Sequence, residues 1–146
     1  MKKPVSVLVL IHTPDLQVLL LERAAHPGFW QSVTGSQEGE EPFIATALRE
    51  TAEETGLAAK VEDLVDWRLA NRYQIFPEWR HRYPPGVTEN TEHVFSLMLP
   101  LAAPVAVAPA EHLGYRWLPW REAARAVFSW SNRDALLMLA LGPQRR

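Results

Sequence analysis

Three glutamates near the middle of the chain have the spacing of a site that could carry chemistry. Glu53 and Glu54 lie three and four residues after Glu50, so on a helix the three carboxylates would be neighbours on one surface. Their mutual repulsion is unfavourable unless a cation lies among them, and oxygen clusters of this kind suit Mg²⁺ or Mn²⁺. A solvated acidic helix face is the alternative, and for three glutamates alone it is the more common outcome.

Residues 42–55 have the pattern of an amphipathic helix that would position these acids. Its apolar residues recur every four positions, at Ile44, Leu48 and Ala52, which forms one face that can pack on a sheet. Pro42 suits the start of a helix, and Gly56 suits the position just past its last turn, where a left-handed backbone is favoured. The polar, glycine-bearing residues 35–41 are typical of a loop leading into the helix.

The remaining pattern alternates strands and turns before two helices near the end. Residues 5–11 and 16–21 favour a hairpin, and further strands are predicted at 29–34, 60–73, 93–99 and 114–118. Helices are predicted at 120–127 and 131–141, and residues 74–91 form a long proline-bearing excursion that is a candidate lid. Hairpins combined with helices indicate an α+β sandwich, which we expect to be one domain spanning residues 1–146.

Composition excludes several classes of protein and site. The chain has no cysteine, so disulfides, thiolate metal sites and cysteine nucleophiles are absent. Its formal charge of −2 gives no basic field for a nucleic-acid polymer. The apolar run 5–11 is only seven residues long, too short for a membrane span or a secretory signal. We therefore expect a cytoplasmic protein without a membrane or nucleic-acid partner, and we expect a monomer.

The residues around the glutamates resemble the Nudix box. Gly35 is followed after five residues by Glu41, and after seven more by the run RETAEETGL at 49–57. The resemblance implies the Nudix fold, with a mixed sheet between helices, and hydrolysis of a diphosphate linked to another moiety. It also implies two or more divalent ions on Glu50, Glu53 and Glu54, with the Gly35 carbonyl as a further ligand and Arg49 orienting the acids. An ordinary helix pair between Arg49 and Glu53 is compatible with that role.

Two departures from the box concern its geometry rather than its ligands. Thr51 stands where a bulky aliphatic residue is usual, and Gly39 lies one place earlier than the usual glycine. Because Thr51 keeps a methyl group that can pack, we expect at most a weaker anchoring of the helix.

Segments outside the box resemble the bacterial Nudix enzymes that act on dihydroneopterin triphosphate in folate synthesis. These segments are FWQSVTGS (29–36), RHRY (80–83), PGVT (85–88), NTE (90–92), EHL (111–113) and SWSNR (129–133). The resemblance implies that Glu111 supplies a metal ligand from outside the helix. It also implies substrate contacts from Lys2, Arg23, Thr34, Tyr73, Gln74, Ile75, Phe76, Arg80, Arg82 and Ser129. The alternatives are a surface role for Glu111 and Arg23 and a helix cap at Ser129, while His112 is assigned a structural role.

Basic and aromatic residues alternate in the segment from residue 68 to residue 83. This segment contains one acid, Glu78, and five basic residues: Arg68, Arg72, Arg80, His81 and Arg82. The aromatic residues interleaved with them are Tyr73, Phe76, Trp79 and Tyr83, and Trp67 comes just before. Arginine can bind phosphate oxygens in bidentate fashion, and a flat heterocycle can stack on aromatic rings. The segment therefore predicts an anion and ring site, with core aromatics and solvated arginines as the alternative.

These observations lead to one principal hypothesis and two rivals. The chain would release pyrophosphate from dihydroneopterin triphosphate, with Glu53, Glu54, Glu111 and Arg49 in the catalytic machinery and Glu53 or Glu111 taking the proton from water. The first rival is a house-cleaning Nudix hydrolase that acts on dATP or a similar nucleotide. The second is a Nudix-fold module that binds a nucleotide without hydrolysing it.

Overall fold

The computed structural model describes residues 1–142, so the last four residues of the predicted domain 1–146 lie outside the described residues. The strands are β1 (Val5–His12), β2 (Gln17–Arg23), β3 (Trp30–Gln31), β4 (Val33–Ser36), β5 (Leu64–Gln74), β6 (Glu89–Met98) and β7 (His112–Pro119). The helices are α1 (Phe43–Thr55), α2 (Trp120–Ala126) and α3 (Trp130–Leu141), with 3₁₀ turns η1 (Val61–Asp63) and η2 (Pro77–Arg82). None of the helices in residues 1–142 is long and apolar enough to cross a membrane.

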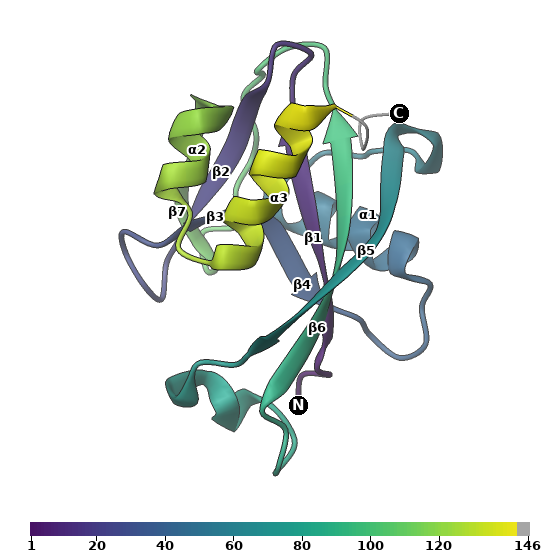
Figure 1. Ribbon diagram of the computed structural model, residues 1–146, viewed down its shortest axis with the longest axis vertical. Coiled ribbons are helices and arrows are strands. Elements are labelled where there is room, and N and C mark those ends of the chain that lie inside the picture. Colours follow the sequence, from purple (N-terminus) through teal and green to yellow (C-terminus); the bar gives the residue numbers. More distant parts are fainter. Residues whose placement is uncertain (143–146) are drawn as a thin grey trace.

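The strands form one mixed seven-stranded sheet with β1 at its centre (Figure 1). On one side β1 pairs in parallel with β6 along its whole length. Its other edge is shared, because β4 pairs with Ser6 to Val9 and β2 pairs with β1 at His12. Strand β2 continues outward to β3 and β7, and β5 pairs antiparallel with β6. The predicted hairpin between the first two strands is present.

Two hydrophobic cores lie on opposite faces of this sheet. Along β1, Val7, Val9 and Ile11 pack in the core that includes Ala47 of α1. The intervening Leu8 and Leu10 pack in the core built with α2 and α3. Successive side chains of a strand point to opposite faces, so the continuous apolar run of β1 serves both layers. The predicted α+β architecture, a mixed sheet between helices, is confirmed (Figure 1).

Helix α1 ends where the sequence predicts. Gly56 has a φ of +74°, and its backbone N–H donates to the Ala52 carbonyl, closing the last turn. Such a left-handed backbone is unfavourable for residues with a Cβ, which explains the glycine at this position.

Four sequence predictions of local structure are wrong in detail. The predicted strand 29–34 divides into β3 and β4, which pair with different strands. Gly35 and Ser36 belong to β4 rather than to the loop, and residues 61–63 form η1 rather than strand. The excursion ends at residue 88, because residues 89–91 already pair in β6. In each case the local sequence pattern is overridden by tertiary pairing. A segment becomes a strand only where it pairs with a strand distant in the sequence.

Candidate active site

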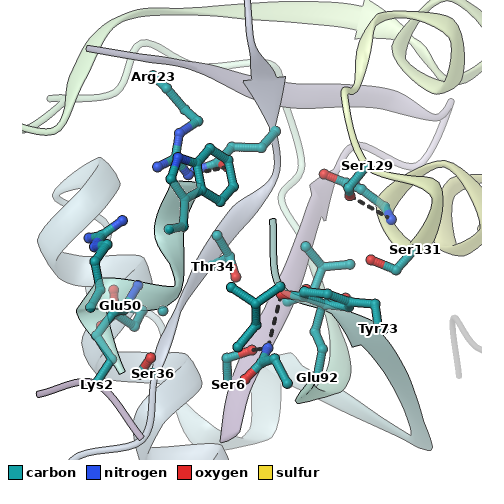
Figure 2. A pocket seen from close by; sticks show the side chains of 18 of the residues that line it. Lys2, Ser6, Arg23, Thr34, Ser36, Glu50, Tyr73, Glu92, Ser129 and Ser131 are labelled. Atoms are coloured by element: carbon teal, nitrogen blue, oxygen red, sulfur yellow. Dashed lines mark hydrogen bonds between the residues drawn. The ribbon is translucent and has the colours of Figure 1, made fainter. Parts of the chain in front are cut away.

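A cavity of about 1100 Å³ opens over the sheet, and most of the site residues predicted from the sequence line it (Figure 2). Those lining it are Lys2, Arg23, Thr34, Gly35, Glu50, Glu54, Tyr73, Gln74, Ile75, Phe76, Arg82, Glu111 and Ser129. Arg49, Glu53 and Arg80 do not line it. A volume of this order accommodates a nucleotide-sized ligand.

The floor of the cavity is one face of the sheet, and strand register explains which residues it presents. Ser6 of β1 lies opposite Ser36 of β4 and Glu92 of β6. Asn90, two residues before Glu92, lies opposite Tyr73 of β5. Residues that are paired across strands, or two apart along one strand, share a face. The same face carries Leu8 and Val94 into the core beneath α3, so the cavity is the polar continuation of that core.

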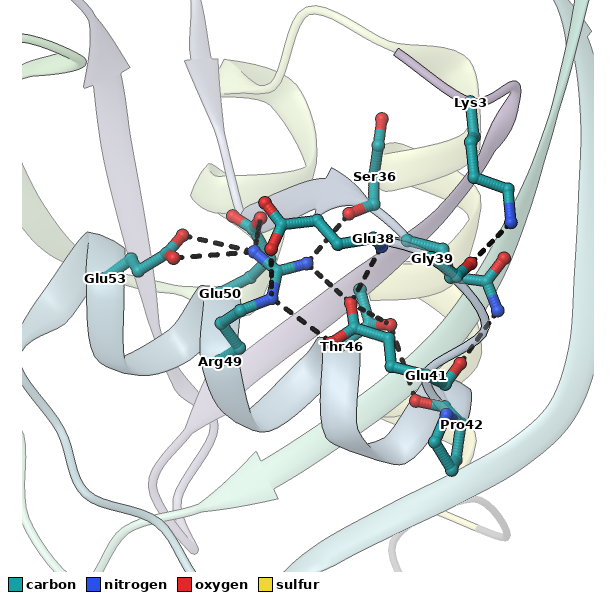
Figure 3. Close-up of polar contacts among 11 residues, drawn as sticks. Lys3, Ser36, Glu38, Gly39, Glu41, Pro42, Thr46, Arg49, Glu50 and Glu53 are labelled. Carbon is teal, nitrogen blue, oxygen red and sulfur yellow. Dashed lines mark hydrogen bonds and ion pairs between the residues drawn. The ribbon is translucent and has the colours of Figure 1, made fainter.

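Arg49 holds the acidic residues of the box in place, although it lies outside the cavity (Figure 3). Its guanidinium donates to Glu41 at 2.7 Å, to Glu50 at 2.7 Å and to the Ser36 carbonyl at 2.9 Å. The Arg49 side chain lowers the pKa of the Glu41 carboxyl to about 2. A weaker contact reaches Glu53 at 3.3 Å. Arg49 therefore connects β4, the loop before α1 and α1 itself. Its predicted contacts with the acids of the box and with Glu53 are both present.

Gly35 is required by the position of Glu50. A Cβ built on Gly35 would collide with the Glu50 carboxyl group. The carboxylate therefore lies directly against the β4 backbone, in the position that the Arg49 hydrogen bond also favours. Only glycine permits this close approach.

Glu50 and Glu54 form a buried acidic pair on the cavity wall. Glu54 is only 1% exposed, and its Oε1 has no hydrogen-bond partner within the described residues. Burial raises the pKa of both carboxyls. The neighbouring acids Glu50 and Glu111 raise the pKa of Glu54 further. Burying an unsatisfied carboxylate is costly unless an opposite charge compensates it. This pair therefore fits a bound divalent cation.

The other two predicted acids, Glu53 and Glu111, are less closely associated with this pair. Glu53 is half exposed and turned toward Arg49, whereas Glu111 lies in the segment before β7, where its carbonyl accepts from Ala24 N–H. Across residues 1–142, no three acidic or imidazole side chains already converge as a metal-binding group. Ligation by Glu53 and Glu111 stays a prediction.

Three cations line the cavity near the acidic pair. Desolvation by burial and their mutual repulsion lower the pKa values of Lys2 and Arg23, and Arg82 contributes to both shifts. No acid pairs with any of the three within 4.0 Å in the described chain. Lys2 is tied to η2 because its backbone N–H donates to the Arg82 carbonyl at 2.8 Å. A cluster of cations without close ion pairs, beside an acidic pair that fits a divalent ion, is suited to a polyphosphate.

Aromatic side chains form another wall of the cavity. The rings of Phe76 and Trp79 have centroids 4.8 Å apart, and Trp79 lies 6.0 Å from Phe128. The Arg23 guanidinium lies 4.7 Å from the Trp79 ring centroid. This arrangement can hold a flat heterocycle next to phosphate-binding cations.

The predicted anion and ring site at residues 68–83 is only partly correct. Its second half reaches the cavity, but Arg68 and Arg72 lie on the exposed face of β5. The Trp67 ring packs against the core beneath α3, and Arg80 donates to the Ile75 carbonyl at 3.1 Å. The alternation of a strand turns half of its residues away from any site on the other face.

Hydrogen bonds link Arg23 through Gln31 to His112, which lies beside the acidic pair. The Gln31 side-chain oxygen accepts from Arg23 at 3.1 Å, so the Gln31 amide nitrogen faces His112 Nε2 at 3.3 Å. Burial and Arg23 lower the pKa of His112 to about 4, which makes its ring neutral at pH 7. Its 3.9 Å approach to Glu54 is therefore not an ion pair at that pH. The structural role assigned to His112 is consistent with this position, although His112 also lines the cavity.

Several cavity residues were missed by the sequence reasoning. They are Ser6, Gln31, Asn90, Glu92, Phe128, Ser131 and Asn132. Four of them lie in the segments NTE and SWSNR. The sequence therefore pointed to these segments but assigned no role to these four residues. Ser129 both lines the cavity and caps α3, since its Oγ accepts from the Asn132 N–H at 3.2 Å. We refer to Gly35, Glu41, Arg49, Glu50 and Glu54 as the acidic end, and to Tyr73, Phe76, Trp79, Asn90, Glu92, Phe128 and Ser131 as the ring end.

Comparison with known proteins identifies close relatives of this arrangement. The chain is 45% identical to a dihydroneopterin triphosphate diphosphatase of Escherichia coli K12 over 138 residues, which cover 92% of this chain and 91% of that protein. It is 36% identical to the Haemophilus influenzae protein of the same name, over 90% of this chain and 84% of that one. The solved structure of the E. coli dihydroneopterin triphosphate pyrophosphohydrolase superposes with a TM-score of 0.90 and 43% identity, covering 96% and 97% of the two chains.

The family follows from the extent of these matches. Residues 2–139 match the family described as the NUDIX domain, which is nearly the whole described chain. The acidic pair, the glycine against Glu50 and the Arg49 contacts account physically for the box that the sequence contains. The chain belongs to the Nudix family.

Proposed function

We propose that this chain is a pyrophosphohydrolase that converts dihydroneopterin triphosphate into dihydroneopterin monophosphate and pyrophosphate, a step of folate biosynthesis. Support comes from the two relatives of that name, whose similarity extends over nearly the whole of both chains. The observation that carries the proposal is the cavity itself. It places a buried acidic pair, three uncompensated cations and an aromatic wall within reach of one ligand.

Each group of residues has a task in this reaction. Lys2, Arg23 and Arg82 bind the phosphate oxygens and share the negative charge that develops on them. Nudix hydrolases generally use divalent metals. Here Mg²⁺, or Mn²⁺, would be held by Glu50, Glu53, Glu54 and Glu111 with the Gly35 carbonyl, where it supplies charge neutralisation and a more acidic water. Arg49 positions the carboxylates.

The reaction balances with water as the only co-substrate. A water oxygen attacks the α or the β phosphorus, and the bond breaks between that phosphorus and the oxygen that bridges the α and β phosphorus atoms. Glu53 or Glu111 accepts the proton of the attacking water. Pyrophosphate leaves, and the pterin monophosphate remains between the ring wall and Thr34, with Gln74, Ile75 and Ser129 alongside.

Pyrophosphate release under Mg²⁺ from dihydroneopterin triphosphate and from dATP tests the proposal against its first rival. A purine could use the same aromatic wall and the same cations, so some activity on dATP is expected. A higher kcat/KM for the pterin substrate supports the proposal. Parity, or a preference for dATP, would make the chain a house-cleaning hydrolase instead.

A binding module without hydrolytic activity is the second rival. It would bind the triphosphate in the presence of Mg²⁺ but release no pyrophosphate. The intact acidic end disfavours this role, because a purely binding protein has no need of a buried, repelling carboxylate pair. We further propose that the protein acts as a cytoplasmic monomer, which size-exclusion chromatography with light scattering tests for the oligomeric state.

A further inference from the structure

One buried carboxylate in the cavity has no part in the reaction described above. Glu92 lies on β6 and forms part of the cavity floor together with Ser6 and Asn90. Its side chain is 4% exposed, and its Oε1 has no hydrogen-bond partner within the described residues. Figure 2 shows Glu92 beside Tyr73 and Ser6, separated from Glu50 and Lys2 by the width of the pocket. Glu92 is therefore not placed to share the phosphate-binding task.

The surroundings of Glu92 offer acceptors but no cation. Asn90 uses its amide nitrogen to donate to Ser6 Oγ at 2.8 Å and to Tyr73 Oη at 2.9 Å. Those two bonds fix the orientation of the amide, and the Asn90 Oδ1 is left without a partner. The Ser131 hydroxyl also makes no well-formed hydrogen bond in the described chain, although it lies close enough to Glu92 to lower the pKa of that carboxyl. No basic group contributes to the environment of Glu92. Burial raises its pKa to about 7, and the Ser131 hydroxyl counteracts that shift only in part.

Unpaired buried acceptors indicate a ligand that brings donors. Leaving a buried carboxylate unsatisfied costs more than leaving a neutral group unsatisfied, so its presence on a cavity wall requires compensation. Within the described chain the Ser131 hydroxyl offsets this cost only in part, because the pKa of Glu92 stays raised. Donors from a bound molecule would satisfy it, and the ring end is where the heterocycle of the substrate lies in the proposed function.

The two rival heterocycles differ in the donors that they present. The pyrimidinone ring of a pterin carries a ring N–H next to a 2-amino group, and guanine has the same edge. Two adjacent N–H donors match the two oxygens of an ionised carboxylate. Adenine instead presents its 6-amino group next to an unprotonated ring nitrogen, which accepts hydrogen bonds and would repel a carboxylate oxygen.

We propose that Glu92 is a specificity-determining residue, whose carboxylate accepts hydrogen bonds from the ring N–H and the 2-amino group of a 2-amino-4-oxopyrimidine. The inference rests on the proposed function and deepens it, because it explains how a cavity that could admit several heterocycles selects a pterin. The Asn90 Oδ1, which has no partner, and the Ser131 hydroxyl, which can donate or accept, lie beside this contact. A site built to pair polar groups rejects ligands that leave those groups unpaired.

The test uses the Glu92→Gln variant, which keeps the size of the side chain but replaces one acceptor oxygen by a donor. Pyrophosphate release is measured for dihydroneopterin triphosphate, dGTP and dATP with Mg²⁺. We expect kcat/KM for the pterin substrate and for dGTP to fall roughly 10- to 100-fold, as for loss of a hydrogen bond to a charged group. The value for dATP should change less than about 3-fold or rise. Glu62→Gln, an exposed glutamate on η1, is the matched control.

A binding measurement without metal separates ring recognition from catalysis. Dihydroneopterin, which carries no phosphate, is titrated into metal-free wild type and Glu92→Gln, and quenching of tryptophan fluorescence is followed. The inference predicts binding to the wild type that weakens at least 10-fold in the variant. Circular dichroism confirms that both proteins are folded, and Glu92→Asp serves as a second variant if the glutamine protein is not.

The outcomes distinguish the inference from the function on which it rests. If wild type cleaves the pterin substrate but Glu92→Gln loses pterin, dGTP and dATP activity equally, or loses none, the specificity role is wrong and the function stands. If wild type itself prefers dATP, the proposed function fails first. A selective loss of pterin and dGTP activity, with dATP retained, supports both.

Discussion

The acidic end and the ring end of the cavity are built in different ways. At the acidic end, residues 35–54 supply the glycine, the acids and the arginine that orients them. At the ring end, the side chains come from β5, β6, η2 with the residue before it, and the α2–α3 connection with the start of α3. Some of their polar atoms have no partner in the described chain. The first arrangement carries chemistry shared across the family, and the second can change heterocycle without disturbing it. The comparison can be tested by changing one end at a time.

The largest effect is expected from Glu54→Gln at the acidic end. Removing one charge from the buried pair should lower kcat by roughly 1000-fold, on the scale of losing electrostatic stabilisation in an active site. In the proposed function this end acts on the phosphates rather than the heterocycle, so the ratio of kcat/KM for the pterin substrate to that for dATP should stay within about 3-fold. Steady-state pyrophosphate release with both substrates measures this. A changed ratio would mean that the two ends are not independent, and Glu122→Gln on α2 is the control.

The second effect concerns stability at the ring end and its dependence on pH. Burial raises the pKa of Glu92 to about 7 in the folded chain, above the ordinary glutamate value of 4.5, so the folded state binds the proton more tightly. The stability of the wild type should therefore fall as pH rises from 4.5 through 7, by roughly 3 kcal/mol in total. Urea unfolding of wild type and Glu92→Gln at pH 5 and pH 8 tests this. The variant should gain stability relative to wild type only at pH 8, and an equal difference at both values would contradict the burial argument.

A smaller effect is expected from Gly35→Ala. The added methyl group collides with the Glu50 carboxyl, which must then leave its position beside β4 and weaken its bond to Arg49. We expect kcat to fall roughly 10- to 100-fold, as for a misplaced catalytic group, together with a higher Mg²⁺ requirement. A Mg²⁺ titration of activity provides the measurement. Gly114→Ala is the matched control, because a Cβ there meets open space; equal losses in both variants would exclude the specific role of Gly35.

The smallest effect tests the departure from the Nudix box at Thr51. Thr51 is 0% exposed and its hydroxyl has no partner among the described residues. Thr51→Val keeps the shape and removes this buried hydroxyl, so it should raise the free energy of unfolding by about 1 kcal/mol. Thr55→Val should lower it by a similar amount, since the Thr55 hydroxyl donates to the Thr51 carbonyl at 2.6 Å. Urea unfolding of the two variants should give opposite signs, and activity should not change in Thr51→Val.

Local patterns in the sequence were sufficient for several elements of the fold. The stop of α1 at Gly56 and the β1–β2 hairpin depend on neighbouring residues, and the structure confirms them. The predicted apolar face of α1 is only partly correct, because Ile44 and Leu48 pack on the core but Ala52 is exposed. Patterns that depend on distant partners were less accurate. Residues 29–34 divide into two strands because β3 pairs with β2 while β4 pairs with β1. Ser32 lies at the break, where its backbone N–H donates to Asn132 of α3.

The sequence by itself determined the chemistry of the acidic end. The spacing of Gly35, Glu41, Arg49, Glu50 and Glu54 fixes which side chains share one helix face and its adjoining loop, and such neighbours are local in the chain. At the ring end the sequence indicated Tyr73, Phe76 and Trp79, and the tertiary structure alone decided the polar residues beside them. Glu92, Asn90 and Ser131 meet there only because β6 pairs with β1 and α3 covers that face of the sheet. Strand register and helix packing over long sequence separations set this arrangement, and a single sequence does not display them.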